Sequence, residues 1–240
     1  ITAGHAMLEA GADILDIGGE STRPGATAVP AEEELARVLP VIRELAKAAP
    51  VSVDTRNAAT MRAALEAGAE IVNDVSALRH DPEALPLLLA SHAPVVLMHM
   101  PGDDPATMQS RATYGDVVLE VAAFLRDRIA TCEALGIPRG RIAIDPGIGF
   151  GKTIDHNLAL IDRLPIFAAL GCRVVLGASR KRFIGTLSGV EEPGRRVPGS
   201  IAAALAGAAR GASVLRVHDV AETMQALAVW RACAAGRVVE

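Results

Sequence analysis

Short runs of apolar, β-branched residues recur along the chain, each followed by a polar or glycine-containing loop and then by an Ala- and Leu-rich stretch. This alternation is typical of βα units that build a parallel sheet. Apolar residues at three- and four-residue spacing predict helices, among them Glu32–Ala48, Ala58–Ala67, Tyr114–Leu135 and Ile201–Arg210. The short runs predict seven strands: Asp13–Ile17, Val51–Asp54, Ile71–Val75, Val95–Met100, Ile142–Asp145, Val174–Gly177 and Val214–Val217.

Glycines after Ala or Leu mark the ends of several helical stretches. A glycine at this place can adopt the left-handed conformation that ends a helix before the next strand. We expect that conformation at five positions: Gly11, Gly68, Gly136, Gly171 and Gly211.

Polar residues at the strand ends decide between an open sheet and a closed barrel. Nearly every predicted strand has an unusual residue at or just past its carboxyl end, namely Asp16, Gly18, Glu20, Asp54, Asn73, His99, Asp145, Ser179, Arg216 and His218. A barrel gathers all strand ends on one rim, whereas an open sheet uses only those beside its switch point. We therefore predict an α/β fold of the (β/α)8 TIM-barrel type.

About seven of the eight barrel strands are present in this prediction. The chain opens at Ile1 within a predicted helix, so we expect one strand and its loop to be missing upstream. A length of 240 residues, about half of them apolar, suits one barrel domain over residues 1–240.

Composition narrows the classes of function. A net charge of −4 gives no global basic field, which argues against nucleic-acid binding. The scattered cysteines, Cys132, Cys172 and Cys233, form no CxxC spacing and argue against a disulfide framework or a zinc site. No apolar run reaches the roughly 18 residues of a membrane span. We expect a cytoplasmic protein without a membrane partner.

Two strand-end carboxylates and an amide suggest a binding edge. Asp54 and Asp145 end apolar strands, and a buried carboxylate requires donors from the protein or a ligand. Each can instead cap the segment that follows. With Asn73 on the same rim, they would suit a flat heterocycle that has an amino group and a ring N–H beside a carbonyl.

Cationic residues follow the last two predicted strands. Arg216 and His218 are two apart, so in a strand both side chains face the same way and can bind an oxyanion. A salt bridge to Asp219 is the alternative. The segment 177–185 adds a hydroxyl and three cations, and barrels commonly hold phosphate in these two loops. For Arg182 a solvated basic face is the alternative.

Two glycine-containing loops have distinct interpretations. The loop Gly18–Gly25 has a Ser-Thr-Arg run that a simple turn does not need, which favours a ligand role for Arg23. The segment 145–153 ends like a Walker A loop but has Pro146 where that motif requires glycine. Close approach to a flat ligand, with Phe150 as a packing surface, fits better. His99 is interpreted as a structural histidine.

In this order, the motifs resemble those of bacterial dihydropteroate synthases. The similar segments are Asp-Ile-Gly-Gly-Glu-Ser-Thr-Arg-Pro-Gly, Val-Ser-Val-Asp-Thr, Val-Asn-Asp-Val, Leu-Met-His-Met, Asp-Pro-Gly-Ile-Gly-Phe-Gly-Lys, Gly-Ala-Ser-Arg-Lys-Arg-Phe-Ile-Gly and Arg-Val-His-Asp-Val. The resemblance implies an eight-stranded barrel enzyme, a transferase of folate biosynthesis. It also implies a homodimer through the late helices and a sulfonamide target.

The resemblance implies a role for each site residue. Asp54, Asn73 and Asp145 would hold the pterin edge, and Met98 and Phe150 would line its pocket. The catalytic set would be Arg216, His218, Lys181 and Arg23. The remaining implied contacts are Lys181 to the pterin carbonyl, Ser179 to the para-aminobenzoate carboxylate, Thr22 and Arg23 over that second substrate, and Arg216 with His218 on the pyrophosphate.

The implied reaction condenses hydroxymethyl-dihydropterin pyrophosphate with para-aminobenzoate. In this family pyrophosphate leaves first, so stabilisation of leaving-group charge by Arg, His and Mg²⁺ is the main requirement. The weak aniline nucleophile then attacks the resulting cation without a strong general base.

One departure concerns the metal. The family's Asn-x-Thr-Pro-Asp-Ser-Phe loop, which supplies an asparagine to the magnesium pyrophosphate, has no counterpart here, so we expect no metal ligand within this chain.

Two alternative functions remain. One is a methyltetrahydrofolate-corrinoid methyltransferase, a related barrel that does not need the Ser-Arg-Lys and Arg-x-His motifs. The other is a catalytically silent pterin-binding barrel.

Overall fold

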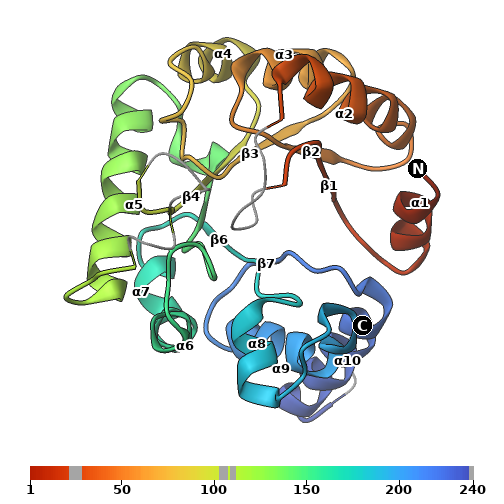
Figure 1. Cartoon of the computed structure of the whole chain (residues 1–240), viewed down its shortest axis with the longest axis vertical. Coiled ribbons are helices and arrows are strands. Elements are labelled where there is room, and N and C mark those ends of the chain that lie inside the picture. Colours follow the sequence, from red (N-terminus) through yellow and green to blue (C-terminus); the bar gives the residue numbers. More distant parts are fainter. Residues whose placement is uncertain (22–28, 103–107, 109–111, 238–240) are drawn as a thin grey trace.

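The computed structural model describes residues 1–21, 29–102, 108 and 112–237. Seven parallel strands form one sheet in the order β1-β2-β3-β4-β5-β6-β7, so each strand pairs with its neighbours in the sequence. Their bounds are β1 Leu15–Gly18, β2 Val51–Asp54, β3 Ile71–Asp74, β4 Val95–Met98, β5 Ile142–Asp145, β6 Arg173–Leu176 and β7 Val214–Leu215. The sheet curls into an open half-barrel (Figure 1).

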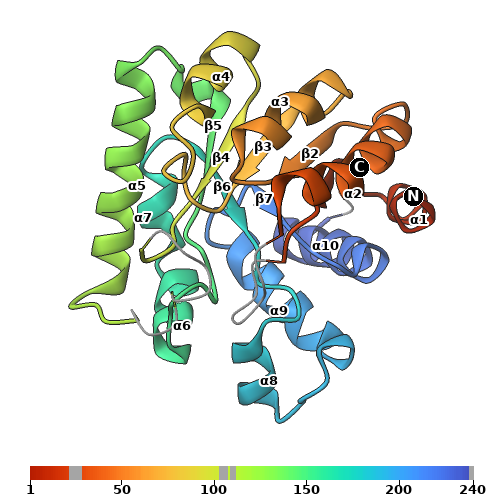
Figure 2. The same cartoon turned by 45° about the horizontal axis from the view of Figure 1, so that its top comes forward.

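Helices cover the outside of this curved sheet (Figures 1 and 2). Each predicted helix is present, with ends shifted by a few residues. The bounds are α1 Thr2–Glu9, α2 Ala31–Leu45, α3 Ala58–Glu66, α4 Ala84–Ser91, α5 Val117–Ala134, α6 Ile154–Asp162, α7 Leu164–Ala168, α8 Arg182–Ser188, α9 Val197–Ala208 and α10 Val220–Ala235. None of the described helices is long and apolar enough to cross a bilayer.

The main core lies between the sheet and these helices. Val51 and Val53 of β2 and Ile144 of β5 are fully buried, and they pack with helix residues such as Ile42 of α2 and Leu125 of α5. Burying such side chains contributes roughly 1.5–3 kcal/mol each before the entropy of ordering the chain is counted.

The predicted helix ends are confirmed. All five glycines expected to be left-handed have positive φ, at Gly11, Gly68, Gly136, Gly171 and Gly211. After each of them the chain turns back to the next strand or to its approach. These turns return the chain to the start of the next strand, so the carboxyl ends of the parallel strands lie on the same rim of the sheet.

Two strands end two residues earlier than predicted. β4 ends at Met98 rather than Met100, because its partner β5 ends at Asp145, the residue that pairs with Met98. β7 ends at Leu215 rather than Val217, and within the described chain it pairs only with β6. Arg216 and His218 therefore lie just beyond the ladder, not within a strand.

Candidate active site

The carboxyl ends of the strands place most of the predicted site residues on one rim. Asp54 ends β2 and Asp145 ends β5, as expected. The parallel register pairs Asp54 with Asn73 and Met98 with Asp145. Residues that are far apart in the sequence thus become neighbours through the sheet alone.

A cluster of charges joins the two edges of the sheet. The Arg216 guanidinium donates from Nε to Asp16 Oδ2 at 2.6 Å and from Nη2 to Asp54 Oδ2 at 2.9 Å. Asn73 Nδ2 also donates to Asp16 Oδ2, at 3.0 Å. Arg216, the residue after β7, thereby contacts β1 and β2 across the open side of the half-barrel.

This cluster has more negative than positive charge. Burial and the nearby charge of Asp16 together raise the pKa of Asp54 to about 7, against the opposing charge of Arg216. Asp16 Oδ1 is buried and has no hydrogen-bond partner among the described residues. A buried acceptor without a donor is costly, so this oxygen is a natural contact for a ligand that has N–H groups.

The structure corrects the alternative considered for Arg216. Its salt bridges are to Asp16 and Asp54, whereas Asp219 pairs with Arg180 through two hydrogen bonds, one of them Arg180 Nε to Asp219 Oδ2 at 3.0 Å. The reason is that Arg216 lies just after the end of β7, across the open side of the half-barrel from β1 and β2: its backbone N–H donates to the Leu176 carbonyl of β6, and its side chain reaches Asp16 and Asp54.

Lys181 and Asp145 lie beside this cluster on the same rim, and both interact electrostatically with Arg216. Asp145 is 7% exposed, and its Oδ1 accepts from the Gly147 backbone N–H at 2.7 Å. Burial raises the pKa of Asp145, and the charge of Lys181 opposes that rise. Lys181 donates to the Ile148 carbonyl, and its Nζ lies 4.8 Å from the centre of the Phe150 ring.

Burial lowers the pKa of Lys181 to about 8 against the opposing charge of Asp145. The residue therefore remains largely protonated at neutral pH but is held in a dry environment. An ammonium in such a place is suited to a ligand carbonyl, which would add an acceptor to those it already has.

The two predicted pocket residues come together in a small apolar cluster separate from the main core. Met98 is 4% exposed and packs with Val75 and Met100, and Phe150 lies against this cluster. Thioether and aromatic surfaces at a rim of charged groups can hold the faces of a flat ring while the polar groups bind its edge.

Ser179 and His218 form a second polar contact on the rim. Ser179 is 6% exposed, and its Oγ lies 3.0 Å from His218 Nδ1 and accepts from the His218 backbone N–H at 3.3 Å. Arg216 and His218 thus make separate contacts, one with the carboxylates of β1 and β2 and the other with Ser179. Their joint action on one oxyanion stays a prediction.

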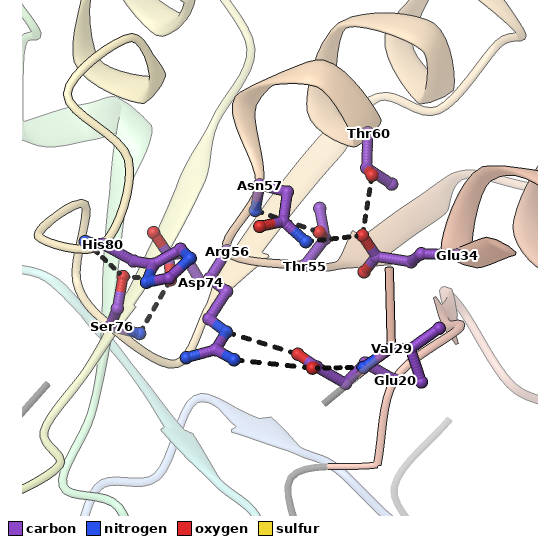
Figure 3. Close-up of polar contacts among 10 residues, drawn as sticks. All are labelled: Glu20, Val29, Glu34, Thr55, Arg56, Asn57, Thr60, Asp74, Ser76 and His80. Atoms are coloured by element: carbon purple, nitrogen blue, oxygen red, sulfur yellow. Dashed lines mark hydrogen bonds and ion pairs between the residues drawn. The ribbon is translucent and has the colours of Figure 1, made fainter. Parts of the chain in front are cut away.

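Thr22 and Arg23 lie outside the described residues, but the chain on either side of segment 22–28 is visible. Glu20 Oε1 accepts from the Val29 backbone N–H at 3.1 Å, so one carboxylate connects the two sides (Figure 3). Arg56, two residues after β2, donates from Nε to Glu20 Oε2 at 3.3 Å.

Removing the Arg56 charge should destabilise the fold, because the Glu20 and Arg56 side chains are only 10% and 12% exposed. We expect Arg56→Met to lower the free energy of unfolding by about 1–3 kcal/mol in urea denaturation. Arg126→Met is the matched control, since the Arg126–Asp127 pair is 65% and 68% exposed. It should change stability by less than about 1 kcal/mol. Equal effects would contradict the anchoring role of Glu20.

Two other buried carboxylates near the rim support the backbone. Asp74, at the end of β3, accepts from Ser76 Oγ at 2.7 Å and from the Leu78 backbone N–H at 2.9 Å. Glu34 of α2 accepts from Asn57 Nδ2 at 2.8 Å and Thr60 Oγ1 at 2.6 Å (Figure 3). The described partners of Asp74 lie in the turn after β3, which fits a capping role. Glu34 instead joins α2 to side chains at the start of α3, and its Oε1 is buried with no hydrogen-bond partner among the described residues.

Two residues of the site were not assigned from sequence. Asp16 was noted only as a polar strand end, whereas it lies within β1, two residues before the strand ends and in register with Ser52. Lys152 was passed over with the rejected Walker-like motif, yet it is 6% exposed and its Nζ lies 3.0 Å from His99 Nδ1. No local sequence pattern marks this lysine, because its burial depends on how the loop after β5 packs on the end of β4.

The described residues contain no group of three or more His, Cys, Asp or Glu side chains arranged to hold a metal ion.

Comparison with known proteins identifies the family. The pterin binding enzyme family matches residues 1–218. The chain is 50% identical over 231 residues to dihydropteroate synthase from Neisseria meningitidis serogroup B, an alignment that covers 94% of this chain and 81% of that protein. The chain belongs to the dihydropteroate synthase family. The Escherichia coli K12 dihydropteroate synthase is 44% identical over 225 residues, covering 93% of this chain and 79% of that protein.

Solved dihydropteroate synthases have the same fold. A Xanthomonas albilineans dihydropteroate synthase with 4-aminobenzoic acid superposes with a TM-score of 0.92 at 55% identity, covering 98% of this chain and 84% of that one. The same organism's enzyme with 7,8-dihydropteroate gives a TM-score of 0.89 at 51% identity, covering 98% and 86%. The Yersinia pestis dihydropteroate synthase with a sulfonamide drug gives 0.93 at 41% identity, covering 98% and 85%. The predicted TIM-barrel class is thus confirmed.

Proposed function

We propose that this chain catalyses the dihydropteroate synthase reaction on the rim formed by the carboxyl ends of β1 to β7. The substrates are hydroxymethyl-dihydropterin pyrophosphate and para-aminobenzoate, and the products are dihydropteroate and pyrophosphate. Membership of the family supports the reaction. The observation that carries its location is the convergence of Asp54, Asn73 and Asp145 beside the cluster of Met98 and Phe150.

The pterin ring binds with its amino-bearing edge toward the carboxylates. Asp145 and Asp54 accept from the amino group and ring N–H, and Asn73 adds an amide. Met98 and Phe150 contact the ring faces, and Lys181 donates to the ring carbonyl. The unpartnered Oδ1 of Asp16 supports an N–H donor in the same pocket.

Departure of pyrophosphate is the demanding step. The C–O bond at the pterin methylene breaks, pyrophosphate leaves with the electron pair, and the electron-rich ring stabilises the resulting cation. Arg216 and His218 bind the phosphate oxygens as negative charge develops there. The exposed side of Arg216, whose side chain is 46% exposed, supports this contact. The para-aminobenzoate nitrogen then bonds to the cation and loses a proton to solvent.

The second substrate lies beside Ser179, which binds the carboxylate of para-aminobenzoate. Thr22 and Arg23 contribute from the segment that follows Glu20. Support comes from the Xanthomonas albilineans relative, which was solved with 4-aminobenzoic acid. The Yersinia pestis relative was solved with a sulfonamide drug, which supports this chain as a sulfonamide target.

Magnesium enters with the pyrophosphate. Mg²⁺ is usually held by substrate phosphates and one or two protein oxygens, and when bound it neutralises leaving-group charge.

The enzyme acts as a homodimer through its late helices, where Met224 and Val229 of α10 are exposed. Free Cys132, Cys172 and Cys233 agree with a cytoplasmic location.

Product analysis separates this function from its alternatives. With hydroxymethyl-dihydropterin pyrophosphate, Mg²⁺ and para-aminobenzoate, we expect dihydropteroate and pyrophosphate to form in equal amounts. Methyl transfer from methyltetrahydrofolate to a corrinoid, without dihydropteroate, would indicate the methyltransferase. Pterin binding without release of pyrophosphate would indicate a silent binder.

A further inference from the structure

A buried lysine ties two pocket-forming segments together at the base of the rim. Lys152 follows the glycine-rich loop after β5, and its Nζ lies 3.0 Å from His99 Nδ1 and 2.9 Å from the Phe150 carbonyl oxygen. His99 directly follows β4, so the contact spans 53 residues of sequence. The lysine therefore joins the end of one strand to the loop after the next.

Both partners are adjacent to residues that line the proposed pterin pocket. His99 follows Met98, and the Phe150 carbonyl belongs to the residue whose ring packs on the same apolar cluster. The loop is also closely packed on His99, since a Cβ at Gly147, where φ is +72°, would lie 2.0 Å from the His99 carbonyl oxygen. A shift of the loop would move Phe150 relative to Met98.

The imidazole of His99 serves as an acceptor. Burial lowers the pKa of His99 to about 2, with the charges of Lys152 and Arg79 adding to the effect, so the ring is neutral. The ring also packs edge-on against Phe124, with centroids 4.9 Å apart. A neutral ring fixed in this way presents one nitrogen lone pair to the Lys152 ammonium.

We infer that Lys152 is a positioning residue for the pterin ring, because its bridge from His99 to the Phe150 carbonyl fixes the distance between the Met98 and Phe150 walls of the pocket. This inference rests on the proposed function. An apolar residue would fill the same buried volume without the cost of burying a charge. The ammonium is useful here because it satisfies several acceptors at once.

The charge of Lys152 should depend on pH near neutrality. Burial lowers the pKa of Lys152 to about 7, against the charge of Asp145 on β5 and with that of Lys181 after β6. The other groups near the pair are Arg79, which donates to the Met100 carbonyl, and Tyr114, which donates to the Gly151 carbonyl. Burial raises the pKa of Tyr114 to about 12, so it stays neutral over this range.

The test uses Lys152→Met together with two His99 variants. Asn in place of His99 keeps an acceptor near the Nδ1 position, whereas Leu removes it. We expect Lys152→Met and His99→Leu to raise the KM for hydroxymethyl-dihydropterin pyrophosphate roughly tenfold. The KM for para-aminobenzoate should stay within about twofold, and His99→Asn should recover most of the loss.

A pH series supplies a readout that a merely structural lysine would not change. Calorimetry with unphosphorylated hydroxymethyl-dihydropterin should show that the affinity of wild-type protein, relative to that of Lys152→Met at the same pH, falls as pH rises through about 7. Unchanged pterin KM in the variants, or a parallel rise in both KM values with a lower melting temperature, would overturn the inference. Absence of dihydropteroate from wild-type protein would instead count against the proposed function.

Discussion

Asp145→Asn should weaken the binding of hydroxymethyl-dihydropterin by roughly 50-fold, or about 2.3 kcal/mol. The carboxylate is buried at the end of β5, and its only hydrogen bond seen within the described residues is to Gly147 N–H. The Asn amide has the same shape as the carboxylate, but its neutral oxygen is a weaker acceptor than a charged one. Its NH₂ group is itself a donor and would face the N–H donors of the pterin. Isothermal titration calorimetry of the purified variant measures the loss.

The same substitution should not destabilise the free protein. Burial raises the folded-state pKa of Asp145 above its unfolded value, so the folded state binds more protons and stability falls as pH rises above about 4. Asn removes this penalty. The variant should therefore unfold at an equal or higher urea concentration at pH 7 while binding pterin less tightly.

Asp74→Asn is the matched control at the end of β3. Asp74 is fully buried, and its oxygens accept from Ser76 and Leu78. Its amide variant should lose stability but keep pterin affinity within about twofold. If the two variants lost pterin affinity equally, the assignment of Asp145 as a direct contact would be wrong.

Arg216→Met should reduce turnover about 100-fold, the usual cost of removing one donor from a developing oxyanion. Its guanidinium also lies against Asp16 and Asp54, so its loss has a second consequence. Because Arg216 opposes the raised pKa of Asp54, that pKa should rise further in the variant. Steady-state release of pyrophosphate measures the first effect.

Binding of unphosphorylated hydroxymethyl-dihydropterin across pH separates the two effects. This ligand has no pyrophosphate, so it reports only on the pterin edge. Ionisation of Asp54, at a pH of about 7, should increase the affinity for this ligand. Deprotonation of Lys152 acts in the opposite direction, so the Asp54 contribution is measured in the Lys152→Met background. There, Arg216→Met should move the midpoint to higher pH.

Arg210→Met is the control for charge removal as such. Arg210 contacts Asp162 at 3.2 Å, and their side chains are 39% and 70% exposed. We expect wild-type turnover and an unchanged pH midpoint. A loss of turnover in both variants, or an Arg216 variant with wild-type turnover, would contradict the role given to Arg216.

Periodicity and turn residues were enough to predict the order of elements. β2 and β5 have the predicted bounds, because each is an apolar run ended by an aspartate that the rim requires. The start of α9 was placed four residues too late, at Ile201 instead of Val197. Pro198 in its first turn was a usable signal, since proline fits the beginning of a helix.

The partners of the site residues were harder to predict. A sequence shows that Asp54 ends a strand, but it does not show that Arg216, 162 residues later, will contact it. That contact depends on the curvature of the sheet and on how early β7 ends. Likewise, the burial of Lys152 depends on packing between the loop after β5 and the end of β4, which no local pattern encodes.

The most direct test of the central claim is a crystal structure of this protein with 7,8-dihydropteroate. Our account predicts the pterin ring between Met98 and Phe150, with its amino edge on Asp54, Asn73 and Asp145 and its aminobenzoate carboxylate near Ser179. Product bound away from the carboxyl ends of β2 to β5, or with its pterin edge pointing away from these carboxylates, would contradict the account.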